Sequence, residues 1–578
     1  MTSDTPAGRA QAIGRQLDHI EARLMAGHLD RRGFIRMATM LGVGTLAATT
    51  MADKALAIGA NQAELKRELQ PRYDYIVCGS GSSGSVVARR LAEDTGVQVL
   101  LLEAGGAADA PSILNPAVWY TNIGGPFDWG YKTMPRPGLN NRSIAMPMGK
   151  AIGGGSSINA TVWARGHKND YDRWARETGD PAWGYQHVLE IFKRIEDRQG
   201  EPDPARRGKG GLVFMQPAPD ASPLAPAMVQ GCAAIGIPAF ADHNGAMMEG
   251  AGGAAIANLC IGKDGRRRNV PSHYLYPIMD QPNLTILTQA LVHKVTLQGK
   301  KAVGVEFEWD GRVRKIGVAR EVVLSTGAIN TPRILMASGI GDAKELVRLG
   351  TPVVANLPGV GQNFQDHTMV AACMWEPPEQ APARNNSAEA TFFWKSDPKL
   401  PTPDLQPFQI EIPFSSEITS KQAVPTAWTI GPGIVQPKTR GFLRFTSTDP
   451  KAGVEIHAKV LEHPDDMAAM RKAIELCREI GNSAPMKPFV KREVMPGPIK
   501  GAELDDFIRN AAVSYFHATC TAKMGKDKMS VVDAKLRVHG VQDLRIADGS
   551  VMPHITTGNT MAPCVIIGER LAEIVKAG

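Results

Sequence analysis

The first β-prone segment of the chain runs directly into a glycine-rich turn. Residues 73–78 (Tyr-Asp-Tyr-Ile-Val-Cys) precede Gly79, Gly81 and Gly84, and residues 85–92 have the apolar spacing of a helix that packs on a sheet. In such a unit the first glycine permits the tight turn and the second lets the backbone approach a pyrophosphate, while the third allows close helix–strand packing. This feature predicts a dinucleotide whose phosphates lie at the helix N-terminus.

A second apolar strand supports this prediction. It spans residues 97–102 and ends at Glu103, whose carboxylate can accept hydrogen bonds from the hydroxyls of an adenosine ribose. The motif itself does not distinguish FAD from NAD. Its place at the start of the folded region, followed by Ala-Gly-Gly at residues 104–106, favours FAD.

Length, charge and cysteine content limit the other possibilities. A chain of 578 residues exceeds what one hydrophobic core usually organises, so we expect two interlocking domains. The net charge of +7 is too small and too scattered to indicate nucleic-acid binding, and the run Arg266–Arg268 is interpreted as a solvated loop rather than a phosphate site. The 7 cysteines are dispersed without a C-x-x-C pair, so we predict neither a metal site nor a disulfide framework.

The N-terminal segment has the features of an export signal. Paired arginines, Arg31 and Arg32, precede the uncharged and mildly apolar residues 37–52, and an A-x-A pattern follows at residues 55–57. The apolar stretch is too short to span a bilayer. We therefore expect residues 1–57 to be a twin-arginine signal that directs the protein to the periplasm, with a basic leader helix or a membrane anchor as the alternative. No other segment suggests a membrane span.

Five later stretches resemble the signatures of the glucose–methanol–choline (GMC) flavoenzymes and follow one another in the family's order. They are residues 149–166, 327–341, 359–367, 515–525 and 548–563. The resemblance implies an α/β fold in which a Rossmann-like FAD-binding domain is interleaved with an antiparallel-sheet substrate-binding domain. The FAD-binding domain would comprise residues 73–184, 256–369 and 516–578, and the substrate-binding domain residues 185–255 and 370–515.

The resemblance also implies which residues contact the cofactor. Three consecutive glycines, residues 153–155, leave room for a ligand against the backbone. Some family members attach FAD covalently through a histidine in the first signature, but this chain has Ile158 there, so we predict non-covalent FAD. The predicted cofactor-binding residues are Gly79, Gly81, Ser82, Ser83, Gly84, Glu103, Gly154, Asn159, Val162, Val292 and Asp548.

Two residues match the family's catalytic positions. His517 would accept the hydroxyl proton of an alcohol while the carbon-bound hydride passes to the flavin, because the pKa of imidazole lies near working pH. Asn559 cannot titrate and would orient the substrate oxygen. Cys520 stands where the family usually has glycine, either as a packing change or as a group that narrows the substrate channel. His367 is assigned to the flavin-domain loop, and His554 is left as a group that could line the pocket.

These matches predict FAD-dependent oxidation of a small-molecule alcohol to an aldehyde or ketone. Residues 406–411 and 392–394 are candidate pocket segments. Glu411, at the end of the first, is either a partner for a cationic substrate or a solvent-exposed strand carboxylate. A quinone, a cytochrome or oxygen would reoxidise the flavin. The alternatives are a hydroxynitrile lyase on the same fold, an NAD-dependent dehydrogenase and a non-catalytic flavin carrier.

Overall fold

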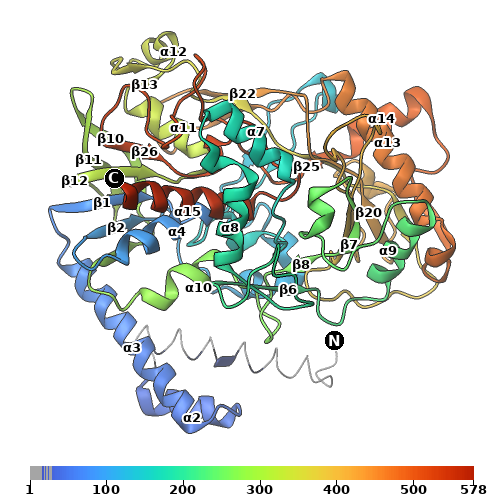
Figure 1. Ribbon diagram of the computed structural model, residues 1–578, viewed down its shortest axis with the longest axis horizontal. Coiled ribbons are helices and arrows are strands. Elements are labelled where there is room, and N and C mark those ends of the chain that lie inside the picture. Colours follow the sequence, from blue (N-terminus) through green and yellow to red (C-terminus); the bar gives the residue numbers. More distant parts are fainter. Residues whose placement is uncertain (1–12, 14–15, 18–19, 21–23, 25–28) are drawn as a thin grey trace.

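The computed structural model of the chain describes residues 29–578 and, before them, residues 13, 16, 17, 20 and 24. Its larger sheet has the strand order β10 (Leu291–Gln298), β11 (Lys301–Trp309), β12 (Arg312–Leu324), β1 (Arg72–Cys78), β2 (Val99–Leu102) and β9 (Leu284–Leu287). Strand β26 (Leu544–Ile546) also pairs with β12 (Figure 1). Strands β9, β2, β1, β12 and β26 are parallel, whereas β10 and β11 are antiparallel to their neighbours.

The carboxyl ends of the parallel strands are in register. Cys78 of β1 pairs with Leu102 of β2 and Leu324 of β12, and Leu324 pairs in turn with Ile546 of β26. The segments that leave this edge begin at Gly79, Glu103, Ser325 and Ala547. Since ligands of open parallel sheets bind outside the carboxyl ends of the strands, this edge is where a nucleotide site is expected.

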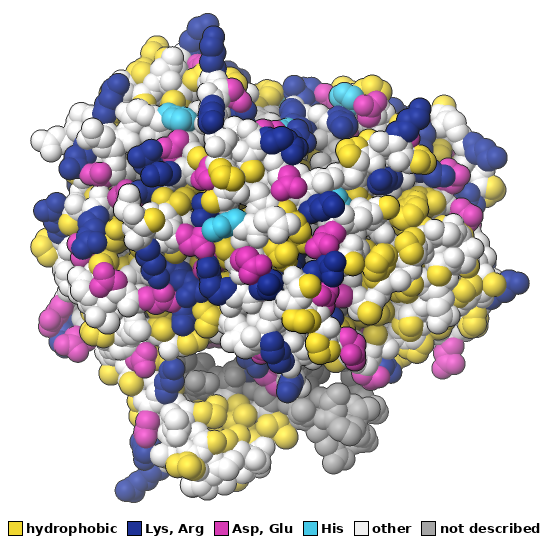
Figure 2. Space-filling model, viewed as in Figure 1, with side chains coloured by type: hydrophobic (Ala, Val, Ile, Leu, Met, Phe, Trp, Pro, Cys, Tyr) yellow, Lys and Arg dark blue, Asp and Glu magenta, His cyan; other side chains and the backbone are white. Residues whose placement is uncertain are grey.

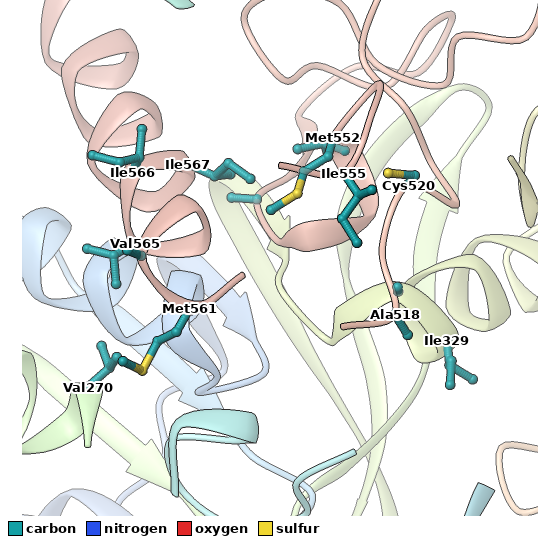
Figure 3. Packing of buried hydrophobic residues seen from close by; sticks show 14 of the residues in the cluster. Val270, Ile329, Ala518, Cys520, Met552, Ile555, Met561, Val565, Ile566 and Ile567 are labelled. Carbon is teal, nitrogen blue, oxygen red and sulfur yellow. The ribbon is translucent and has the colours of Figure 1, made fainter. Parts of the chain in front are cut away.

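Two helices from opposite ends of the sequence cover one face of the sheet. Helix α4 (Ser82–Ala92) buries Val86, Val87 and Leu91, and α15 (Met561–Ala577) packs closely against it. A Cβ atom added to Gly568 would lie 2.8 Å from the Ser83 carbonyl oxygen, so the glycine is what lets the two backbones approach. Figure 3 shows Val565, Ile566 and Ile567 of α15 among the buried hydrophobic side chains.

A second sheet stands beside the first and is antiparallel throughout. Its strand order is β24 (Arg492–Met495), β17 (Met374–Glu376), β20 (Trp428–Gly431), β19 (Phe408–Ile410), β18 (Ala390–Phe393) and β7 (Gly253–Ile256). Helices α9 (Leu224–Ala234) and α13 (Pro464–Gly481) pack on it (Figure 1). The two sheets confirm the predicted fold class, a Rossmann-like sheet with an interleaved antiparallel sheet.

Two helices at the N-terminus form a hairpin that projects from the body of the molecule (Figures 1 and 2). Helix α2 (Arg31–Met40) and α3 (Thr45–Arg67) share a buried apolar cluster separate from the main core. Helix α3 is fixed to the large sheet by Gln62, which donates to Leu284 O at 2.8 Å and accepts from Ile286 N at 3.1 Å. The A-x-A pattern at residues 55–57 therefore lies within a continuous helix. Among the residues that the structure describes, no helix is long and apolar enough to cross a membrane.

Candidate active site

One cavity follows the carboxyl edge of the parallel strands and brings together residues from distant parts of the chain. The predicted site residues that line it are Gly79, Gly81, Ser82, Ser83, Glu103, Gly154, Asn159, Val162, Val292, His517, Asp548 and Asn559. Gly84 lies beneath the turn instead, where an added Cβ would meet the Gly79 carbonyl oxygen at 1.9 Å. Its place agrees with a role in helix–strand packing.

The glycines of the turn and of the following cavity segment are needed for different physical reasons. Gly79 has φ +95°, and an added Cβ would lie 2.4 Å from Ser325 O, so the protein's own packing excludes a side chain there. At Gly81 the nearest atom to an added Cβ is 4.0 Å away, and at Gly155 no atom lies within 4 Å. No atom of the described residues fills these two places. They form a cradle that a bound pyrophosphate and flavin would occupy.

The N-terminus of α4 faces the same cradle. Gly81 is its N-cap and provides no side chain to accept a hydrogen bond from the first turn of the helix. The leading N–H groups of α4 are therefore available to a ligand, and the partial positive charge of a helix N-terminus favours a phosphate. The residues present fit the pyrophosphate of a dinucleotide.

Glu103 is held rigidly in the cavity wall. Its Oε2 atom accepts hydrogen bonds from Ser80 N at 2.9 Å and from Ser80 Oγ at 2.6 Å, and Oε1 accepts from Gly105 N at 2.7 Å. Burial raises the pKa of the carboxyl group and outweighs these hydrogen bonds, which lower it. Oε1 accepts only one of these bonds and keeps a lone pair, so it can still accept from a ribose hydroxyl.

Asp548 also lines the cavity. Its Oδ2 atom accepts from Gly327 N at 2.9 Å and from Thr331 Oγ1 at 2.6 Å, both in α11 (Gly327–Ala337). Oδ1 accepts from Ser550 N at 2.8 Å. The carboxylate thus joins the segment after β26 to the start of α11 and leaves main-chain groups of both along the cavity.

A short ladder places two histidines side by side. Strand β25 (Ala512–Ser514) pairs with β16 (Thr368–Val370), with Ser514 opposite Thr368. His517 follows one strand and His367 precedes the other, and their Nδ1 atoms lie 2.9 Å apart. Asp366 fixes this arrangement because its carboxylate accepts the main-chain N–H of His517 at 2.8 Å. His367 therefore contacts the predicted base, which its assignment to the flavin-domain loop did not anticipate.

A chain of hydrogen bonds determines which nitrogen of His517 carries the proton. Gln406 Nε2 donates to Asn559 Oδ1 at 3.0 Å, so the Asn559 amide presents its N–H groups to His517 Nε2, 3.3 Å away. Nε2 must then be unprotonated and Nδ1 protonated, with His367 Nδ1 as the acceptor. Burial lowers the pKa of His517 to about 3, so the ring is neutral at pH 7. The result is a neutral imidazole with a lone pair beside the cavity.

The contacts of Gln406 and His367 could not be predicted from the sequence, for the same reason. Gln406 begins the predicted pocket segment 406–411, of which Phe408 and Ile410 line the cavity, but its contact with Asn559 spans 153 residues. His367 sits in a recognisable stretch, but no local pattern shows that this stretch pairs with residues 512–514. Both sequence motifs, one with Asp366 and His367 and the other with His517, can be identified in the sequence. The pairing between them cannot.

Other candidate residues lie away from the cavity. Glu411 is buried, so it is not the exposed carboxylate considered above, and it does not line the cavity. Burial and the neighbouring Glu389 carboxylate raise the pKa of Glu411 to about 9. Phe392 and Phe393 are core residues, and His554 contacts Arg173, Arg440 and Glu177. Within the described part of the chain, no three metal-ligating side chains form a group.

Cys520 has an unusual backbone for a residue with a side chain. Its φ is +73°, in the left-handed region that glycine adopts freely. The thiol is fully buried in the same apolar cluster as Met552 and Ile555 (Figure 3), and burial raises its pKa to about 12. Cys520 is therefore a packing residue and does not line the cavity.

Comparisons with known proteins show which family the chain belongs to. The N-terminal and C-terminal domains of the GMC oxidoreductase family match residues 73–369 and 437–568. Oxygen-dependent choline dehydrogenase 1 of Chromohalobacter salexigens is 36% identical over 535 residues, 87% of this chain and 95% of the relative. Mitochondrial choline dehydrogenase of Mus musculus is 36% identical over 543 residues, with 87% and 89% covered.

A solved structure shares the same architecture. Pyridoxine 4-oxidase from Mesorbium loti is 32% identical with a TM-score of 0.84, and the match covers 88% of this chain and 99% of that protein. The family domains include the glycine turn, most of the residues that line the cavity and His517. The chain therefore belongs to the GMC oxidoreductase family and is an FAD-dependent oxidoreductase.

Proposed function

We propose that the protein oxidises a small neutral alcohol to an aldehyde or ketone with non-covalently bound FAD. The observation that carries this proposal is the neutral imidazole of His517, whose Nε2 lone pair lies beside the cavity with Asn559 at 3.3 Å. A non-catalytic flavin carrier would need neither residue. Bound FAD would supply the acceptor for the hydride of the alcohol carbon.

The residues of the chain account for the rest of the reaction. The substrate hydroxyl would donate its proton to His517 Nε2 in place of the Asn559 N–H, whose contact is long for a hydrogen bond. Asn559 would then donate to the substrate oxygen and hold the alcohol carbon in one orientation. The positive charge that forms on His517 can be shared with His367 through their Nδ1 contact.

The walls near His517 favour an apolar or aromatic alcohol. Trp119 and Phe516 line the cavity with ring centroids 6.0 Å apart, and Phe408 and Tyr515 line it with ring centroids 6.5 Å apart. The carboxylates in its lining are Glu103 and Asp548, which already accept hydrogen bonds from the protein. A quaternary ammonium group would therefore meet aromatic faces without a carboxylate partner.

The test is anaerobic mixing of the purified protein with a panel of alcohols while the flavin absorbance is recorded. The panel includes primary aliphatic, aromatic, polyol and quaternary-amine alcohols. Bleaching by aromatic or apolar members supports the proposal, and faster bleaching by the quaternary amine contradicts the proposed substrate class. Full FAD content without bleaching by any member would favour the lyase alternative.

Non-covalent attachment is part of this proposal. Ile158 lines the cavity where some relatives have a histidine, and its side chain cannot form a bond to the flavin. Acid precipitation should leave the protein colourless and the flavin in the supernatant. A yellow pellet would contradict non-covalent binding.

Export to the periplasm, with a quinone, a cytochrome or oxygen as electron acceptor, is also proposed. The buried cluster of the α2–α3 hairpin is separate from the main core, and the anchoring Gln62 lies after the A-x-A pattern. Removal of residues 1–57 would thus leave the contact with β9 intact. Arg31→Lys combined with Arg32→Lys should retain the full-length protein in the cytoplasm, and unchanged periplasmic activity would contradict a twin-arginine route.

A further inference from the structure

A buried arginine without an acidic partner lies behind the cavity wall. The run Arg266–Arg268 was expected to be solvated, but Arg267 is 4% exposed. Its Nε atom donates to Ile113 O at 2.7 Å, and Nη1 donates to Asn159 Oδ1 at 2.7 Å and to Ser156 O at 3.3 Å. Among the described residues, Nη2 has no hydrogen-bond partner.

Within the part of the chain that the structure describes, no nearby group neutralises this charge. The one described titratable neighbour that favours the charged form of Arg267 is Cys260, and burial raises the pKa of that thiol so that it stays protonated. Burial lowers the pKa of Arg267 to about 9, which still leaves the guanidinium charged at pH 7. A buried charge without a partner of opposite charge is strongly destabilising. Such a cost is offset when a bound group brings negative charge to the site.

Arg267 contacts the loop formed by residues 154–159. The neighbours of the two ends of this loop show which part of the cavity lies nearest the positive charge. At its start, an added Cβ on Gly154 would lie 3.1 Å from the Cα of Gly81, in the phosphate turn. At its end, Asn159 Nδ2 donates to Met561 Sδ at 3.2 Å, and Met561 follows Asn559 by two positions. Arg267 binds Ser156 and Asn159, so its charge stands behind the catalytic end of the loop rather than behind the phosphates.

Arg267 also fixes the orientation of the Asn159 amide. Asn159 Oδ1 accepts from both Arg267 Nη1 and Thr161 N, the latter at 2.9 Å. The amide nitrogen must therefore point away from Arg267, towards Met561 and the cavity that Asn159 lines. A hydrogen-bond donor backed by a positive charge thus lines the cavity, where bound FAD would meet it.

We propose that Arg267 is a positioning residue that raises the reduction potential of the bound flavin through Asn159 and through its own unneutralised charge. Oxidation of an alcohol transfers two electrons and one proton to the flavin as a hydride, while the hydroxyl proton goes to His517. The flavin gains one negative charge in this step. A buried positive charge behind the ring stabilises that product, because electrostatic interactions are strong in a site of low dielectric.

The test uses the FAD-loaded full chain and two measurements that need no alcohol, so it is independent of the substrate proposed above. Sulfite adds to oxidised flavin as an anion, and its dissociation constant reports the positive charge near the ring. Arg267→Gln should weaken sulfite binding tenfold or more and lower the midpoint potential. A tenfold change in a two-electron equilibrium corresponds to about 30 mV.

Two further variants make the result decisive. Asn159→Asp keeps the shape of the side chain and gives Arg267 a carboxylate partner, so it should produce the same loss even if Arg267→Gln fails to retain FAD. Arg268→Gln is the matched control, because Arg268 belongs to the same run but its side chain is 40% exposed and is paired with Asp264 at 2.8 Å. The proposal would be overturned if Asn159→Asp kept its sulfite dissociation constant within roughly twofold of the wild-type value and its midpoint potential within roughly 10 mV.

Discussion

The Nδ1 atoms of His367 and His517 lie 2.9 Å apart, although 150 residues separate them in the chain. One of the two nitrogens must carry a proton and the other must accept it. Since Asn559 donates to the far nitrogen of His517, the shared proton belongs to His517 and the acceptor is His367. The pair therefore keeps His517 in the tautomer that a base facing the cavity requires.

Replacement of the base itself should abolish most of the chemistry. His517→Ala removes the acceptor of the hydroxyl proton, and flavin reduction by a substrate alcohol should slow by about 10²–10⁴-fold. FAD content should change little, because the flavin cradle is built from other segments. Stopped-flow absorbance measures the rate, and reduction at the wild-type rate would refute the assignment.

The hydrogen bond between the two histidines predicts a graded loss of activity in variants of His367. His367→Leu leaves the Nδ1 proton of His517 without an acceptor and should slow flavin reduction roughly tenfold or more, as loss of a tautomer-orienting group does in other enzymes. His367→Gln keeps a side-chain oxygen that can accept this proton and should retain more activity. Equal rates in the two variants would contradict the role of the hydrogen bond.

Gln406 should act through Asn559. Gln406→Met removes the donor that holds the Asn559 amide, a hydrogen bond worth about 1 kcal/mol, so kcat should fall roughly five- to tenfold. Gln409→Met is the matched control, because Gln409 is also buried in the same region but bonds the Glu389 main chain instead. A similar loss in both variants would indicate a general packing effect.

The glycine turn can be tested without disturbing the fold. A side chain at Gly81 meets no protein atom closer than 4.0 Å, so Gly81→Val should fold normally yet lose FAD, because the side chain occupies the place of the pyrophosphate. Circular dichroism reports the fold and the 450 nm absorbance reports the flavin. Gly453→Val, at a site with no atom within 4 Å and outside the cavity lining, should keep FAD. Full FAD occupancy in Gly81→Val would exclude the phosphate cradle.

The parts of the site that follow local rules could be predicted from the sequence. Gly79, Gly84 and Glu103 lie in one strand–turn–helix–strand unit, whose geometry short-range spacing determines, and the fold class followed from the motif order. The roles of the predicted site residues and the domain boundaries stay predictions. Contacts between distant segments could not be inferred. Glu411 and Arg267 illustrate this, because only the packed chain shows that both are buried and away from solvent.

The close packing of α4 against α15 has a consequence for the order of events during synthesis. The helix that carries the phosphate turn rests on the last helix of the chain, and Ser83 Oγ donates to Cys564 O at 2.7 Å. We expect the turn to reach its packed form only after α15 has been synthesised. Flavin uptake would therefore follow the synthesis of α15, and any transport that follows flavin uptake would carry a folded protein.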